Sequence, residues 1–375
     1  MPNAILSTQT QTGRRLGNGG VRHINPQSQE VWERDRIYCD AHDLPLVYRH
    51  HWEPDQQFYK LDPEYWGELR ARQILDDLSR YPRWPRNLYV VGYNEVAAHN
   101  GEQAELYGRF TIALAQTLAE RGVKLLAFSF SVGHPELYIW PVLYDAMRAV
   151  MSLGGGIDLH EYYLQAEGPW HPDDWTWTFG RHRRIWKALP PDLKDIPTHL
   201  GEIGLDKEGR GAVDGFRARI STETYRDHLL WMGRKLIESR RMGINILDAS
   251  IFICGNDGAW PSFELLGDGR DILEAAINQI NKEAEEAMPW DRHAVYDSWQ
   301  KRFGAEGYNP NDAFGGFISR NPQITVGLFV GPVETQDDWP YFVQKTTTGI
   351  LWVPKKDARP EAVKVAKREE DLPLA

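Results

Sequence analysis

Short apolar runs alternate with amphipathic stretches through the first 270 residues of the chain. The runs are rich in β-branched and aromatic residues and are bounded by turn-forming residues, which is typical of buried strands. Two early runs, at residues 5–8 and 21–24, complete a predicted set of eight strands. The six clearer strands cover residues 46–50, 88–92, 124–130, 157–160, 198–203 and 244–251.

The stretches between the runs have helical periodicity. In residues 101–121 apolar side chains recur at every fourth position from Leu106 to Leu118, which predicts one buried face of a helix. Residues 221–242 repeat this pattern, and residues 271–287 indicate a further helix. Because buried strands alternate with helices, we expect a parallel sheet with right-handed crossovers.

The spacing of the strands favours a closed (β/α)8 TIM barrel in an α/β chain, over residues 1–290. The starts of the six clearer strands are 33 to 46 residues apart, and such a barrel needs about 31 residues per unit, or more where loops are long. A doubly wound open sheet is the competing architecture. It usually carries a glycine-rich phosphate loop, and the glycines at residues 17–20 do not fit the GxGxxG pattern.

After residue 290 the pattern changes to short β-strands joined by turns. The predicted strands cover residues 324–332, 341–345 and 348–353 within a small β-rich region, residues 291–355. This region is either a small module or an extension that packs on the barrel. Residues 356–375 form a highly charged tail that we expect to be solvated.

Composition and charge exclude several classes of protein. The formal net charge of −10 disfavours a nucleic-acid binder, and two cysteines cannot form a disulfide framework or a cysteine-only zinc site. There is no apolar run long enough for a membrane span, and the N-terminal residues do not resemble a signal peptide. A cytoplasmic or a phage-associated location therefore stays open. The 15 tryptophans indicate either stacking platforms for flat ligands or a large core.

Polar residues that end the strands are the candidates for chemistry, because the active site of a parallel barrel lies at the carboxyl ends of its strands. Glu95 and Glu202 each follow an apolar strand directly. Burial there would raise the pKa of a carboxyl group that has no partner. Two carboxyl groups in unlike surroundings are the minimum for glycoside hydrolysis. Other strand-end candidates are Arg49, His50, Trp52, Asn94 and His160.

The order of these motifs resembles that of the clan A glycoside hydrolases, a group of retaining (β/α)8 enzymes. In that clan an Asn-Glu pair ends the fourth strand and a single Glu ends the seventh. Here the sequence YNE, ending at Glu95, falls on the fourth predicted strand and GEIG, with Glu202, on the seventh. The resemblance covers approximately residues 21–260.

The resemblance implies a role for each matched residue. Glu95 would be the general acid/base, Glu202 the nucleophile, and Asn94 would hydrogen-bond the sugar 2-hydroxyl. Tyr162 would hydrogen-bond the nucleophile, with His160 nearby. The residues expected to line the sugar subsite are Arg49, His50, His51 and Trp52, and Trp260 from the loop after the eighth strand.

The sequence departs from the clan pattern in two places. The clan usually has an arginine at the end of the second strand, whereas Arg22 stands near the start of that strand. Many members have a tryptophan at the end of the eighth strand, where this chain reads SIFICGND. Trp260 would then substitute from the loop, or the sugar platform would differ.

Structural interpretations of these residues stay open. Glu95 and Glu202 could be salt-bridged acids at strand ends, and Asn94 could cap the following segment. Tyr162 and His160 could be hydrogen-bonded core residues. A loop after the sixth strand offers sugar platforms or a hydrophobic plug through Trp170, Trp175 and Trp177.

Two other functions compete with a glycosidase. A metal-dependent barrel hydrolase would bring together His50, His51, His160, His199 and Asp248. A non-catalytic carbohydrate-binding barrel would use the tryptophans without turnover. The prediction is a retaining glycosidase that acts on an oligo- or polysaccharide and needs neither metal nor organic cofactor, with its two carboxyl groups about 5–5.5 Å apart.

Overall fold

The computed structural model describes residues 4–24, 28–50, 62–96, 98–163, 178–206, 213–255 and 258–287. It also describes the backbone of residues 329–334, 341–346, 350–354 and 364–366. The chain divides into two compact units, Met1–Glu285 and Glu286–Ala375.

The first unit contains a closed barrel of eight parallel strands in sequence order, which confirms the predicted fold. The ring closes where Leu6, Ser7 and Thr8 of the first strand pair with Ala249, Ser250 and Ile251 of the last. The strands are β1 (Leu6–Thr10), β2 (Val21–Ile24), β3 (Leu46–Arg49), β4 (Leu88–Val91), β5 (Lys124–Phe130), β6 (Gly156–Tyr163), β7 (Thr198–Leu205) and β8 (Ile246–Ile251).

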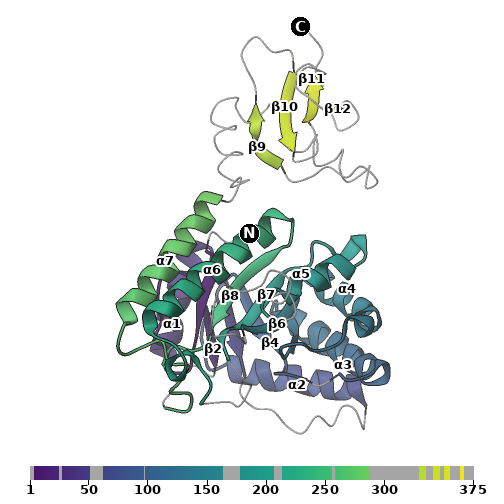
Figure 1. Cartoon of the computed structure of the whole chain (residues 1–375). Coiled ribbons are helices and arrows are strands. Elements are labelled where there is room, and N and C mark those ends of the chain that lie inside the picture. The colour runs from purple at the N-terminus through teal and green to yellow at the C-terminus, as the bar shows by residue number, and fades with distance from the viewer. Residues whose placement is uncertain are drawn as a thin grey trace. The chain divides into compact units, whose positions relative to one another are not determined.

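Helices surround the strands of the barrel (Figure 1). Four of them begin with a side-chain cap that the sequence provides, such as Asn100, which accepts from the backbone N–H of Gln103. None of the described helices has an apolar stretch long enough to span a bilayer. They are α1 (Gln29–His42), α2 (Pro63–Leu78), α3 (Gly101–Ala119), α4 (Tyr144–Ser152), α5 (Arg181–Ala188), α6 (Thr222–Arg241) and α7 (Arg270–Ala287), with 3₁₀ turns η2 (Leu137–Leu143), η4 (Pro191–Leu193) and η5 (Phe216–Ala218).

The connection from β1 to β2 departs from the regular strand–helix alternation, because residues 11–20 contain no helix. It packs closely on the start of the first strand instead. A Cβ atom at Gly19 would lie 1.8 Å from the backbone oxygen of Leu6, and Gly17 has a φ of 76°. The glycines that do not fit a phosphate loop therefore allow a short connection to lie against the barrel.

Two register shifts determine which side chains face the barrel interior. On β6 and β7, Leu159 pairs with Leu200 but His160 pairs with Glu202, so Gly201 is an extra residue in β7. A bulge of this kind changes the direction of the following side chain. It directs Glu202 into the barrel, where its carboxylate meets side chains of β1, β3 and β6. Between β5 and β6 the extra residue is Ser129.

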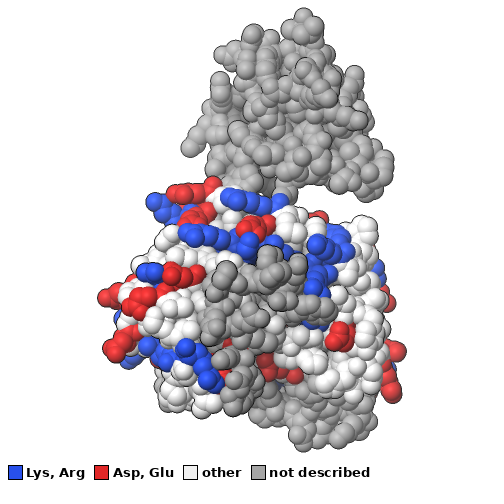
Figure 2. Space-filling view, in the orientation of Figure 1, with Lys and Arg blue, Asp and Glu red and all other residues white. Residues whose placement is uncertain are grey.

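On the face of the barrel unit shown in Figure 2, basic and acidic side chains are interspersed among the described residues. Beneath the surface, apolar residues fill part of the barrel interior, in a cluster of Val47, Tyr89, Val91, Leu126 and Leu247. Such packing is typical of a barrel that is a filled core rather than a channel.

The second unit contains an antiparallel sheet of four strands in the order β12-β11-β10-β9. The predicted strands at residues 324–332, 341–345 and 348–353 overlap β9 (Phe329–Glu334), β10 (Tyr341–Thr346) and β11 (Ile350–Pro354). The tail that we expected to be solvated contains β12 (Lys364–Ala366). This strand pairs with β11 in antiparallel register, which composition does not reveal, and the solvation of the tail stays a prediction.

Candidate active site

Glu202 on β7 is held by donors from three other strands. Its Oε1 accepts from Arg49 Nη1 at 2.7 Å and from Gln9 Nε2 at 3.1 Å. Its Oε2 accepts from the Tyr162 hydroxyl at 2.9 Å and lies 3.5 Å from His160 Nδ1. Because the side chain is only 8% exposed, these contacts fix both the position and the orientation of the carboxylate.

The same contacts keep Glu202 ionised. Burial alone would raise the pKa of Glu202, but His160, Arg49, Arg22 and the Gln9 hydrogen bond outweigh burial and lower that pKa to about 2. Burial and the neighbouring Glu202 carboxylate raise the pKa of Tyr162 well above its usual value, so its hydroxyl stays a donor. The arrangement presents a carboxylate that stays ionised well below neutral pH.

Glu95 follows β4 in a different setting. Its backbone has a φ of 51°, a left-handed conformation that non-glycine residues seldom adopt. Its N–H donates to the backbone oxygen of Ser129 at 2.9 Å, which ties the turn to the bulge of β5. The side chain is 44% exposed and Oε1 lies 3.0 Å from His160 Nδ1. Glu95 can therefore exchange protons with solvent.

The two glutamates come together around one histidine. Glu95, His160 and Glu202 each offer an atom that lies within 4.8 Å of the atoms offered by the other two. Retaining glycosidases hold their two carboxyl groups about 5–5.5 Å apart, whereas inverting enzymes separate them by about 6.5–9.5 Å. The short separation leaves little room for a water molecule between the two groups.

Asn94 is half-buried beside Glu95. Its Oδ1 atom is buried and has no hydrogen-bond partner among the described residues. An unpartnered buried oxygen of this kind costs free energy unless a ligand or a water molecule donates to it. Asn94 thus offers an acceptor next to the acid pair.

His50 does not join this group. Its Nδ1 atom lies 2.9 Å from Arg70 Nη1, and its Nε2 atom lies 3.8 Å from Asp77 Oδ2, so the ring contacts α2. Arg49, the preceding residue of β3, reaches Glu202 instead, because successive side chains of a strand point to opposite faces. The predicted binding residues His51 and Trp52, and the loop tryptophans Trp170, Trp175 and Trp177, lie outside the described residues.

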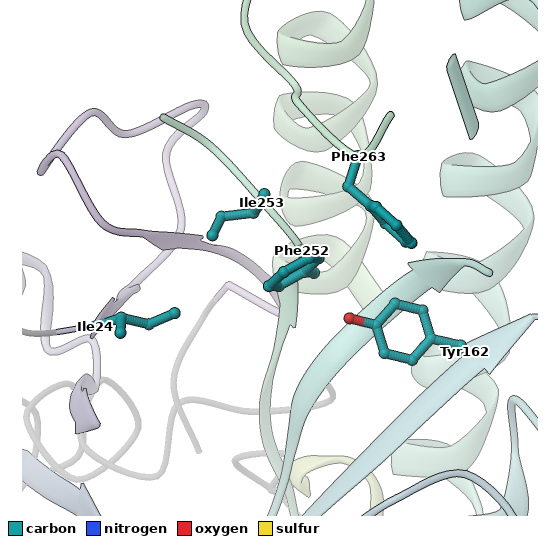
Figure 3. Close-up of a cluster of buried hydrophobic side chains, with 5 residues drawn as sticks. All are labelled: Ile24, Tyr162, Phe252, Ile253 and Phe263. Atoms are coloured by element: carbon teal, nitrogen blue, oxygen red, sulfur yellow. The ribbon is translucent and has the colours of Figure 1, made fainter. Parts of the chain in front are cut away.

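Trp260 packs in an aromatic cluster after β8. The centroid of its ring lies 5.4 Å from that of Phe252 and 5.9 Å from that of Phe263, and both contacts are edge-to-face. Figure 3 shows the neighbouring cluster, in which Tyr162 lies beside Phe252 and Phe263. Phe252 thus stands directly after β8, where the clan pattern has a tryptophan, and Trp260 covers it from the loop.

The sequence analysis missed Gln9 and the effect of Arg22 on Glu202. Gln9 lies one residue beyond the predicted first strand, residues 5–8, and inside β1, and its approach to Glu202 depends on the closure of the barrel between β1 and β8. Arg22 stands near the start of β2, as predicted, and is fully buried, with Nη1 3.3 Å from Asp158 Oδ2. It acts on Glu202 through its charge.

The described members of the competing metal hydrolase's ligand set do not all come together at one point, and His51 lies outside the described residues. His50 contacts α2, and His199 lies between Asp158 and Asp248 rather than beside His160. Within the described ranges, the one group whose donor atoms could hold a cation is Glu95, His160 and Glu202. One oxygen of Glu202 already accepts from the Arg49 guanidinium, which places a positive charge at that group.

No protein-family model matches the chain, and no curated protein matches it either. Solved structures are similar to it, each with a TM-score of 0.44. The glycoside hydrolase family 5 enzyme PbGH5A from Prevotella bryantii B14 is 14% identical, over 70% of this chain and 82% of its own.

A mutated endo-beta-1,4-glucanase from Xanthomonas axonopodis pv. citri is 9% identical over 74% of this chain and 99% of its own. A broad specificity endoglucanase from Ruminococcus flavefaciens is 12% identical over 70% and 83%. At identities and TM-scores this low, the likeness assigns no activity to this chain.

Proposed function

We propose that the chain is a retaining glycoside hydrolase. The observation that carries this proposal is the short approach of two glutamates with unlike surroundings, Glu95 in the turn after β4 and Glu202 within β7. Glu202 is buried and ionised, while Glu95 is open to solvent. Such a pair separates the roles of nucleophile and acid/base.

In the first step Glu202 attacks the anomeric carbon while Glu95 protonates the oxygen of the leaving group. The glycosidic bond breaks and a glycosyl ester forms on Glu202. In the second step Glu95 takes a proton from a water molecule, which attacks the ester from the side that the leaving group vacated. The anomeric configuration of the product equals that of the substrate.

The surrounding residues support these two steps. Arg49 and Gln9 hold Oε1 of Glu202, whereas Oε2 accepts from the Tyr162 hydroxyl. His160 lies between the two carboxylates and orients both. Asn94 offers its unpartnered oxygen to a sugar hydroxyl.

The substrate is a carbohydrate, and a screen of glycosides identifies which one. The panel contains aryl glycosides of the common sugars and fragments of β-1,4-glucan and xyloglucan. The fragments are included because similar solved structures are of an endo-beta-1,4-glucanase and a xyloglucanase. NMR of the first product formed gives its anomeric configuration. Retention is the expected result, and inversion contradicts the proposed mechanism.

A metal-dependent hydrolase is the second candidate, because Glu95, His160 and Glu202 could offer three ligands. Treatment with a chelator distinguishes the two. Activity that survives chelation supports the two-carboxylate mechanism, and activity that is lost and returns with added Zn²⁺ supports the metal.

A further inference from the structure

Four charged side chains form a connected group inside the barrel, and each is at most 1% exposed. His199 lies between two aspartates: its Nδ1 atom is 2.6 Å from Asp158 Oδ1 and its Nε2 atom is 2.9 Å from Asp248 Oδ1. Arg22 Nη1 is 3.3 Å from Asp158 Oδ2. We call Arg22, Asp158, His199 and Asp248 the barrel charge cluster. Barrel interiors are usually filled by branched apolar side chains, so this cluster needs a reason.

The barrel charge cluster lies directly against the residue before Glu202. A Cβ atom at Gly201 would be 1.7 Å from Arg22 Nη1 and 2.4 Å from Asp158 Oδ1. The absence of a side chain at Gly201 therefore lets the Arg22–Asp158 pair approach β7 at its bulge. Arg22 is also one of the positive charges that lower the pKa of Glu202.

The charges of the cluster balance only when His199 is protonated. Arg22 contributes one positive charge and the aspartates two negative ones, so an imidazolium at His199 brings the sum to zero. Burial would lower the pKa of His199, but Asp248 and Asp158 outweigh burial and raise that pKa to about 9. Neutral hydroxyls complete the contacts, from Ser129 to Asp158 and from Ser250 to His199.

Other titratable groups act on the two aspartates from neighbouring elements. They remain unchanged in every variant below, so they cancel from each comparison. The charge of His160 on β6 contributes to the lowered pKa of Asp158. The charge of Asp248 in turn favours the protonated form of three groups: Arg240 on α6, Tyr89 on β4 and Cys39 on α1.

We propose that His199 is a positioning residue for Glu202: held as an imidazolium between Asp158 and Asp248, it keeps the barrel charge cluster neutral and leaves the charge of Arg22 to act on the nucleophile. The proposal deepens the proposed function, since it names a group that supports the ionised state of Glu202 through Arg22. It rests on that function only for its effect on turnover.

The test compares His199→Asn with His199→Asn/Asp248→Asn. The single variant leaves one uncompensated negative charge in the cluster, and the double variant removes it. The pKa of Glu202 is read by ¹³C NMR of glutamate-labelled protein, with Glu202→Gln identifying the signal. We expect the single variant to raise this pKa by about one to three units, as for a like charge nearby, and the double variant to return it most of the way.

Ser250→Ala is the matched control, because it removes a neutral contact of His199 and no charge. It should leave the pKa of Glu202 unchanged. If the protein cleaves a glycoside, the low-pH midpoint of the pH profile of kcat/KM should shift in each variant together with the pKa of Glu202 measured by NMR. A single variant that leaves the pKa of Glu202 in place, or a double variant equal to the single one, overturns the proposal.

Two measurements keep the proposal testable when a variant folds poorly or no substrate is found. In urea the double variant should be more stable than the single one, although it carries one more substitution. In ¹⁵N-histidine-labelled wild-type protein at pH 8, one imidazolium with both ring nitrogens protonated should persist. Its absence overturns the proposal, whereas a failure to cleave any glycoside counts against the proposed function alone.

Discussion

The surroundings of Glu202 and of Glu95 differ in almost every physical respect. Glu202 is buried, its two oxygens accept from Gln9, Arg49 and Tyr162, and its pKa falls to about 2. Glu95 lies at an exposed turn, where its side chain contacts His160. A carboxylate that must attack carbon needs to be ionised and fixed, whereas one that must carry protons needs access to solvent.

This difference supports the proposed roles of the two glutamates without reference to any relative. The assignment can be tested by exchanging the surroundings of the two glutamates, or by removing the hydrogen-bond donors that surround Glu202.

Replacing the nucleophile has the largest effect. Glu202→Ala should lower kcat by about 10,000-fold or more, because the variant lacks the carboxylate on which the proposed covalent intermediate forms. Steady-state kinetics on the glycoside found by the screen measures the loss. Glu105→Ala, at an exposed site on α3, is the matched control and should retain activity. Comparable losses in both variants would contradict a special role for Glu202.

Replacing the acid/base has an effect that depends on the leaving group. Glu95→Gln should lower kcat/KM by about 100-fold to 10,000-fold for sugar leaving groups, which need protonation. Activated aryl glycosides, whose leaving groups need no proton, should lose much less. Measuring kcat/KM across a series of phenols with different pKa values shows this dependence, and an equal loss for all of them contradicts the role of acid.

Removing the Tyr162 hydroxyl affects the position of the nucleophile. Tyr162→Phe should lower kcat by about 10-fold to 100-fold, since a hydrogen bond to a buried charge is lost while the ring packing is kept. Tyr163→Phe is the control from the same strand, because Tyr163 packs on His228 and Trp231 instead. The comparison of kcat between these two variants separates the hydroxyl contact from the general packing of β6.

Removing the neutral donor from β1 has the smallest effect. Gln9→Met keeps the approximate volume but removes the hydrogen bond to Glu202 Oε1, so the pKa of Glu202 should rise from about 2 toward its usual value. A depressed carboxyl pKa in the active form makes activity fall only at low pH. The acid limb of kcat/KM should therefore move to higher pH, by less than about one unit, with little change at pH 7.

The sequence predicts the strands well, and it predicts some helices and the side-chain contacts between distant strands poorly. Strand β5 was predicted with its observed bounds, because a short apolar run between turn formers carries a strong local signal. Strand β2 was also predicted with its observed bounds, although its sequence VRHI is a weaker pattern. Helices α1, α2 and α5 were not predicted. Helix α1 buries Trp32, Asp35 and Cys39, which is too few apolar positions to form a clear periodic face.

The site shows the same division. Glu95 and Glu202 could be named because strand ends share one rim of a barrel. The contact of Gln9 with Glu202 could not, because it depends on ring closure between residues almost 200 positions apart. The inward direction of Glu202 could not be predicted either. A strict alternation of side chains from the inward-facing His199 would direct Glu202 outward, and the bulge at Gly201 directs it inward again.

Azide rescue tests the assignment of the two glutamates most directly. Azide should restore activity on an activated aryl glycoside in both Glu202→Ala and Glu95→Ala, since the small anion enters the space of the missing carboxylate. The Glu202→Ala variant should release a glycosyl azide of inverted anomeric configuration, and the Glu95→Ala variant one of retained configuration. The opposite pairing, or no azide product from either variant, would contradict the account.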